Sequence, residues 1–134
     1  MDDDTYPIEF LDSPFMNGYV ECLLWSSIDG DPEDDSDDPE MVELDKYPES
    51  ASLRYNLVTE AWEFYTAWRE MWVEAGMTDD YAGHNFALTR NHHGTGFWDR
   101  GLGEVGKVLT EASHAYGETN LYLAATVHGW AVFA

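Results

Sequence analysis

The residues best equipped for chemistry in this chain lie between His84 and Arg100. Two glycines, Gly94 and Gly96, stand among polar and aromatic side chains there: His84, Arg90, Asn91, His93, Trp98 and Asp99. A histidine, a carboxylate and an arginine together can act as base, orienting group and anion clamp in phosphoryl or acyl transfer. The candidate catalytic residues are therefore Arg90, His93 and Asp99.

The same residues also fit a structural role, which we favour. Arg90 can pair with Asp99, Asp99 can cap the helix that follows, and the glycines permit a tight turn. Adjacent His92 and His93 point apart on a strand and there is a single cysteine, so no metal site is predicted. No glycine-rich loop joins a strand to a helix as in phosphate or dinucleotide sites, so no cofactor is predicted.

Residues 84–90 alternate with period two, which predicts a strand with Phe86 and Leu88 on one face. Residues 91–96 then form a turn, and 97–98 return as a short strand. On such a hairpin His84 and Arg90 share a face, His93 lies at the turn and Asp99 lies just past the return strand.

The remaining elements are three helices and a second hairpin. Ser13 and Pro14 favour a helix start, and Gly76 and Gly117 favour helix ends. We expect helices at 14–27, from Ser50 or Ser52 to about 76, and at 103–116, with strands at 121–125 and 130–133. The predicted fold is a single α+β domain over 1–134, a small antiparallel sheet of two hairpins packed against about three helices.

The charge excludes two function classes. The 27 acidic residues against six Lys and Arg give a formal charge of −21. Nucleic acids and anionic membranes both need Lys and Arg near phosphates, so direct binding to either is not expected. Two explanations remain: the charge is directed at a basic partner, or it is an adaptation to a salt-rich cytosol, where molar salt screens self-repulsion.

The acidic residues concentrate in three places. Residues 1–12 are expected to be loose, apart from Tyr6, Pro7, Ile8, Phe10 and Leu11, which can lie against the body. Residues 29–45 are expected to form a flexible loop, since they contain little that can be buried. The long helix carries a row of carboxylates on its outer face. The candidate partner-binding residues are Glu60, Glu63, Glu70 and Glu74 on that helix and Asp34, Asp35, Asp37 and Asp38 in the loop.

The expected location is the cytoplasm. The lone Cys22 stands among apolar residues and is expected to be buried and unreactive. The acidic start of the sequence is unlike a secretory signal, and no apolar stretch is long enough for a membrane span.

The central segment resembles a widespread family of small, acidic, uncharacterised proteins of phages and prophages. Members carry a segment similar to H-x-F-x-L-T-R-N-x-H-G-x-G-F-W-D followed by a helix rich in Leu-Thr-Glu-Ala. The matching residues here are His84, Phe86, Leu88–Asn91, His93, Gly94, Gly96–Asp99 and Leu109–Ala112. This chain departs from the pattern at Ala87, where an aromatic is common, and at His92, where a glycine is common. The resemblance implies a viral or mobile-element origin and supplies no activity.

Three functional hypotheses follow. The leading one is a viral effector that binds a basic, nucleic-acid-handling host protein, such as a nuclease or a CRISPR or restriction subunit, with carboxylates standing in for phosphates. Anti-CRISPR proteins and other DNA mimics act in this manner. The second is a small hydrolase-like enzyme that uses the His84–Asp99 segment. The third is a halophile's accessory protein, with a homodimer as one arrangement, whose charge is only solubilising.

Overall fold

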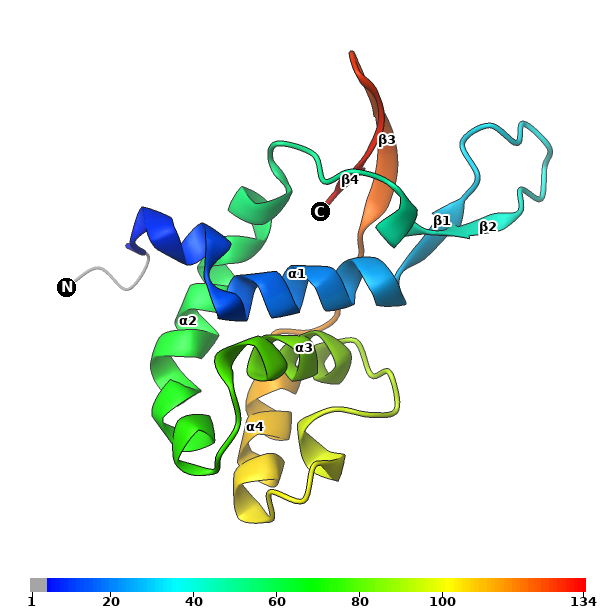
Figure 1. Cartoon of the computed structure of the whole chain (residues 1–134). Helices are drawn as coiled ribbons and strands as arrows, with labels where there is room; N and C mark the ends of the chain where they lie inside the picture. Colours follow the sequence, from blue (N-terminus) through cyan, green and yellow to red (C-terminus); the bar gives the residue numbers. More distant parts are fainter. Residues whose placement is uncertain (1–4) are drawn as a thin grey trace.

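A computed structural model of the chain describes residues 5–134, in which four α-helices and two separate antiparallel hairpins form an α+β fold (Figure 1). The predicted fold class is confirmed, with one more helix than expected and two hairpins that do not share a sheet. In chain order the elements are η1 (Ile8–Asp12), α1 (Pro14–Ser26), β1 (Ile28–Gly30), β2 (Met41–Glu43), η2 (Leu44–Lys46), α2 (Leu53–Glu74), α3 (Asp79–Arg90), η3 (Phe97–Asp99), α4 (Glu104–His114), β3 (Tyr122–Thr126) and β4 (Gly129–Phe133).

Helices α1 and α3 cross in direct backbone contact, one above the other in Figure 1. A Cβ on Gly18 would overlap the carbonyl of Asp80, and a Cβ on Gly83 would overlap the carbonyl of Phe15. Glycine at both positions therefore sets how closely the two helices approach. The Ser13 side chain caps α1 by accepting from the amide of Met16, as its sequence predicts.

The core beneath this crossing is largely aromatic. Phe64 of α2 stacks on Phe86 of α3 with ring centroids 4.1 Å apart, and Phe15 of α1 stacks on Trp72 of α2 at 5.4 Å. Burying each such ring contributes about 2–3 kcal/mol. The buried face of α2 includes Leu57, Val58, Phe64 and Trp72.

The strand predicted over 84–90 is wrong, because these residues form the second half of helix α3. Its interior position explains the error. Nearly every residue from Ala82 to Arg90 is buried, since α1, α2 and α4 enclose the helix, so the sequence shows no polar face of period 3.6. The predicted return strand at 97–98 is likewise a short 3₁₀ turn, η3.

The acidic segment 29–45 is not the structureless loop that was expected. Its ends pair as the β1–β2 hairpin, with Ile28 opposite Glu43, and the hairpin projects from the helical body (Figure 1). Asp34 accepts the backbone amides of Ser36 and Glu40 at 3.1 and 3.0 Å, which closes the tip. The Trp130 indole donates to Glu33 at 3.0 Å and joins the tip to β4.

At the amino end, residues 8–12 form η1, which buries Phe10 against Trp62 and Tyr65, so Phe10 lies against the body as expected. Residues 1–4 lie outside the described residues. Cys22 is buried as predicted, and desolvation raises its pKa to about 12. Within residues 5–134 no helix has the length and apolar character needed to cross a membrane.

Candidate functional site

Arg90, the first candidate catalytic residue, is an interior residue and is 2% exposed. Its guanidinium donates to the Tyr19 hydroxyl at 2.9 Å, to Glu60 at 3.0 Å and to the carbonyls of Gly117 and Tyr116 at 2.9 and 3.1 Å. The expected Arg90–Asp99 pair is not formed. Arg90 instead fastens α3 to α1, α2 and the segment after α4, and four of the five N–H donors of its guanidinium are used within the protein.

Asp99 closes its own turn instead of capping the helix that follows. Its carboxylate accepts the Gly96 amide at 3.0 Å and the Thr95 hydroxyl at 2.8 Å. These hydrogen bonds, the amide of Gly96 first, lower the pKa of Asp99 below its usual value. Helix α4 begins after Gly103 with no side-chain cap. Neither predicted role of Asp99, the pair with Arg90 or the cap of the following helix, is therefore observed.

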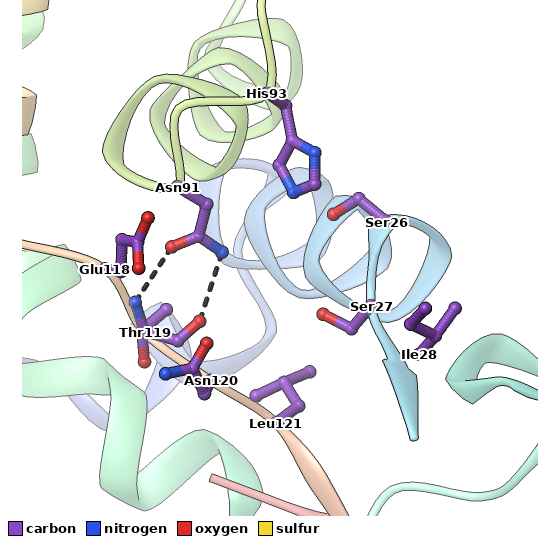
Figure 2. A pocket seen from close by; sticks show the side chains of 9 residues that line it. All are labelled: Ser26, Ser27, Ile28, Asn91, His93, Glu118, Thr119, Asn120 and Leu121. Carbon is purple, nitrogen blue, oxygen red and sulfur yellow. Dashed lines mark hydrogen bonds between the residues drawn. The ribbon is translucent and has the colours of Figure 1, made fainter. Parts of the chain in front are cut away.

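Asn91 and His93 follow the end of α3 and face solvent-accessible hollows. The Asn91 amide makes a reciprocal pair with the Thr119 backbone, accepting at 2.8 Å and donating at 3.1 Å (Figure 2). The backbone turns at His92, which has a φ of 55°, and the amide of His93 then donates to the Leu88 carbonyl. This helix termination usually carries glycine at the position of His92.

Two neighbouring pockets share His93 and Ser26 as lining residues. The first, of about 260 Å³, lies between the ends of α1 and α3 and the chain leading to β3, with His93 across from Ser26 (Figure 2). The second, of about 460 Å³, is lined by Trp25, Ser26, His84, Leu88, His93, Thr95 and Arg100. We call this second hollow the histidine pocket.

His84 forms one wall of the histidine pocket. Its ring stacks between Trp25 and Tyr81, with centroids 6.3 and 6.0 Å away. Burial, and then the neighbouring Arg100, lower the pKa of His84, so the imidazole is neutral at pH 7. Trp98, the remaining residue of the motif, is 56% exposed and is not among the residues that line this pocket.

The proposed catalytic trio is thus not brought together: Arg90 faces the interior, Asp99 faces its own turn, and only His93 reaches a pocket. The side chains that do converge with His93 include Trp25, from the end of α1, and Arg100. Sequence analysis did not select either residue. For Trp25 the reason is its large distance from His93 along the chain, which hides their proximity in the fold.

The acidic candidates divide into internal and free groups. Glu60 pairs with Arg90, Glu63 accepts the Tyr116 hydroxyl at 2.9 Å, and Asp34 closes the hairpin tip. In the described part of the chain, the side chains of five others make no hydrogen bond or ion pair: Asp35, Asp37, Asp38, Glu70 and Glu74.

Glu60 and Glu63 also line a third hollow, of about 480 Å³, together with Trp68, Ala112, Ala115 and Tyr116. We call it the carboxylate pocket. It lies between α2 and the end of α4, and it combines two carboxylates with two aromatic rings.

No family model, curated protein or solved structure gives a significant match to this chain. Residues 5–134 contain no cluster of three or more His, Cys, Asp or Glu side chains arranged to hold a metal ion. The functional argument therefore rests on the geometry and charge of these surfaces.

Proposed function

We propose that the protein binds a basic protein partner, of the kind that handles nucleic acid, through the carboxylate pocket and the acidic hairpin. The observation that supports this most directly is the composition of the carboxylate pocket: Glu60, Glu63, Trp68 and Tyr116 line one hollow. Its two carboxylates disfavour an anionic ligand, while its rings and carboxylates together suit a cationic side chain of a partner.

A guanidinium or ammonium group in this pocket gains two kinds of interaction. The Glu63 carboxylate uses one oxygen for the Tyr116 hydroxyl, which leaves the other free for a charge-assisted hydrogen bond. The faces of Trp68 and Tyr116 add cation–π attraction, about 0.5–2 kcal/mol depending on desolvation. The size of the hollow also suits a long Arg or Lys side chain.

The hairpin supplies a second cluster of negative charge. Asp35, Asp37 and Asp38 lie at its exposed tip, which Asp34 and Glu33 hold in place through their own hydrogen bonds. Arg54, Arg69 and Arg90 pair with carboxylates on other elements, so these cations leave the tip uncompensated. A protein that binds nucleic acid presents a cationic surface, which such a tip attracts. For this reason we propose a nucleic-acid-handling protein as the partner.

The test is affinity capture from a lysate of the source cells at 0.1 and 1 M salt, with bound proteins identified by mass spectrometry. The variants are Glu63→Gln with Trp68→Ala for the pocket and Asp35→Asn/Asp37→Asn/Asp38→Asn for the hairpin. The control is Glu9→Gln/Glu104→Gln/Glu111→Gln, which removes three exposed carboxylates that are not candidates for partner binding.

The proposal expects a basic nuclease, CRISPR subunit or restriction subunit to be captured only at low salt. The control retains it and both test variants lose it, and duplex DNA competes with the protein for it. The proposal is contradicted if the same partner is captured equally at both salt concentrations and by both test variants. Failure to capture any partner, joined with unfolding of the protein in low salt, would favour the interpretation that the charge is only solubilising.

A further inference from the structure

We propose that the histidine pocket is a separate ligand site that binds a mononucleotide, a phosphate monoester attached to a sugar and a flat ring. The site is independent of the carboxylate pocket, and it uses none of the residues assigned above to partner binding. Three features support the inference: the sign of its charge, its uncommitted hydrogen-bonding groups and its exposed aromatic wall.

The residues that line the histidine pocket differ in charge from the protein as a whole. The chain has 27 acidic residues among 134, but none lines this pocket, whereas the guanidinium of Arg100 does. The nearest carboxylate to Arg100 is that of Asp99, at 3.8 Å from Nε and already bonded to Thr95 and Gly96. A guanidinium in a pocket with no carboxylate in its lining favours an anionic group at this place.

Arg100 is held so that it can receive the anion. Its Nε donates to Asn85 at 2.9 Å, and its guanidinium lies over the Tyr81 ring at 5.2 Å. Within residues 5–134 its two terminal amino groups make no hydrogen bond or ion pair. These two groups form the fork that binds two oxygens of a phosphate at once.

The hydroxyl groups of the pocket favour a ligand that carries hydrogen-bond donors in addition to its anionic group. Ser26 donates to the Cys22 carbonyl at 2.6 Å and Thr95 donates to Asp99 at 2.8 Å. Each hydroxyl proton is thereby used, and the oxygen that remains accepts a hydrogen bond from the ligand. Sugar hydroxyls and amino groups of a base meet this requirement.

Trp25 supplies the surface for a flat ring. It is 60% exposed and stands at the rim of the pocket, stacked on one side against His84. A base that stacks on an indole gains about 1–3 kcal/mol. The volume of about 460 Å³ lies within the range of small-molecule sites. A nucleic-acid strand is a poor occupant, since the total charge of −21 repels a polyanion.

The test is calorimetric titration of the full chain with AMP, GMP, CMP and UMP in 0.5 M KCl, which screens the remote repulsion. Adenosine and inorganic phosphate are titrated separately. Trp25→Ala and Arg100→Lys are the test variants, and Trp98→Ala is the matched control because it removes an exposed tryptophan outside the pocket. Circular dichroism and chemical denaturation establish that each variant is folded.

At least one mononucleotide should bind saturably, and its affinity should fall about tenfold or more in each test variant, the loss expected from one charged hydrogen bond or one stacking contact. Trp98→Ala should bind like the parent. Absence of saturable binding up to 5 mM, about the weakest affinity that such contacts would give, overturns the proposal. Equal affinity for inorganic phosphate and a mononucleotide, or full binding by both test variants, overturns it as well.

Proton NMR of the histidine rings gives a second readout. A bound phosphate should raise the pKa of His84, because it introduces a negative charge beside a group whose pKa is lowered in the free protein. The charged and titratable groups around His84 are Arg100 and His93 in this pocket and Glu21, Asp80 and Tyr81 in the hollow on its other side. An unchanged His84 titration in the presence of saturating mononucleotide would contradict the assignment.

Discussion

The guanidinium of Arg90 donates to the carboxylate of Glu60 at 3.0 Å, and this pair joins a buried cation on α3 to a half-exposed anion on α2. The two side chains are 2% and 46% exposed. A buried guanidinium needs a compensating charge, and no other carboxylate pairs with Arg90 in the described part of the chain. Glu60 is therefore a stabilising residue as well as a wall of the carboxylate pocket.

Glu60→Gln should lower the free energy of unfolding by about 1–2 kcal/mol, since it keeps the shape of the side chain and removes the charge that compensates Arg90. Urea denaturation in 0.5 M NaCl measures the change, because the salt suppresses the general benefit of removing one negative charge. Glu70→Gln, at an exposed position of the same helix, is the control and should change stability by less than about 0.5 kcal/mol. Equal effects of the two variants would mean that Tyr19 and the two carbonyls satisfy Arg90 without Glu60.

The crossing of α1 and α3 should tolerate no side chain larger than hydrogen at its contact points. Gly18→Ala and Gly83→Ala should each destabilise the protein by about 3 kcal/mol or more, because each new methyl group overlaps a backbone carbonyl of the other helix. Gly76→Ala is the control, since its φ of +90° adds backbone strain but its Cβ would meet nothing within 4 Å. It should cost about 1 kcal/mol. If all three variants cost the same, the helices do not approach as closely as described.

His92→Gly should stabilise the protein by about 0.5–1 kcal/mol. The residue has a φ of 55°, a left-handed conformation that strains a side chain and suits glycine at a helix end. The substitution also removes a ring stack between His92 and His114, whose centroids are 4.3 Å apart. His114→Ala removes the stack alone, so the difference between the two variants in thermal denaturation isolates the backbone contribution. A net loss of stability for His92→Gly that exceeds the loss for His114→Ala would contradict this account.

Asp99 should make stability depend on pH in the acid range. Its pKa in the folded protein lies below the ordinary value of 3.8, so its contribution is present at neutral pH and is lost as the pH falls through the folded pKa. Asp99→Asn should be less stable than the parent at pH 6, and the difference should vanish towards pH 2, as measured by urea denaturation across this range. Thr95→Ala, which removes one donor to the carboxylate, should weaken this pH dependence. A difference that stays constant from pH 6 to pH 2 would show that the carboxylate's charge is irrelevant to the turn.

Local patterns in the sequence were sufficient for several elements. Ser13 and Pro14 mark the start of α1, Gly117 follows the end of α4, and Leu121 begins the segment that forms the last hairpin. Each prediction depends on residues close together in the chain, where capping, turn chemistry and periodicity act directly. The burial of Cys22 was predictable on the same grounds, since its immediate neighbours are apolar.

The middle of the chain was decided by tertiary structure. The period-two pattern around Phe86 suggested a strand, but helix α3 is enclosed on most sides, so burial removed the polar face that identifies a helix. The partners of the motif residues were also decided by tertiary structure. Arg90 could be selected from the sequence, but its partner Glu60, 30 residues away, could not. The histidine pocket, too, exists only because the end of α1, with Trp25, is folded against His93 and Arg100. By itself the sequence determined the charge, the local helix ends and the last hairpin; long-range packing decided which side chains meet, because such contacts depend on the folded path of the chain and not on spacing along it.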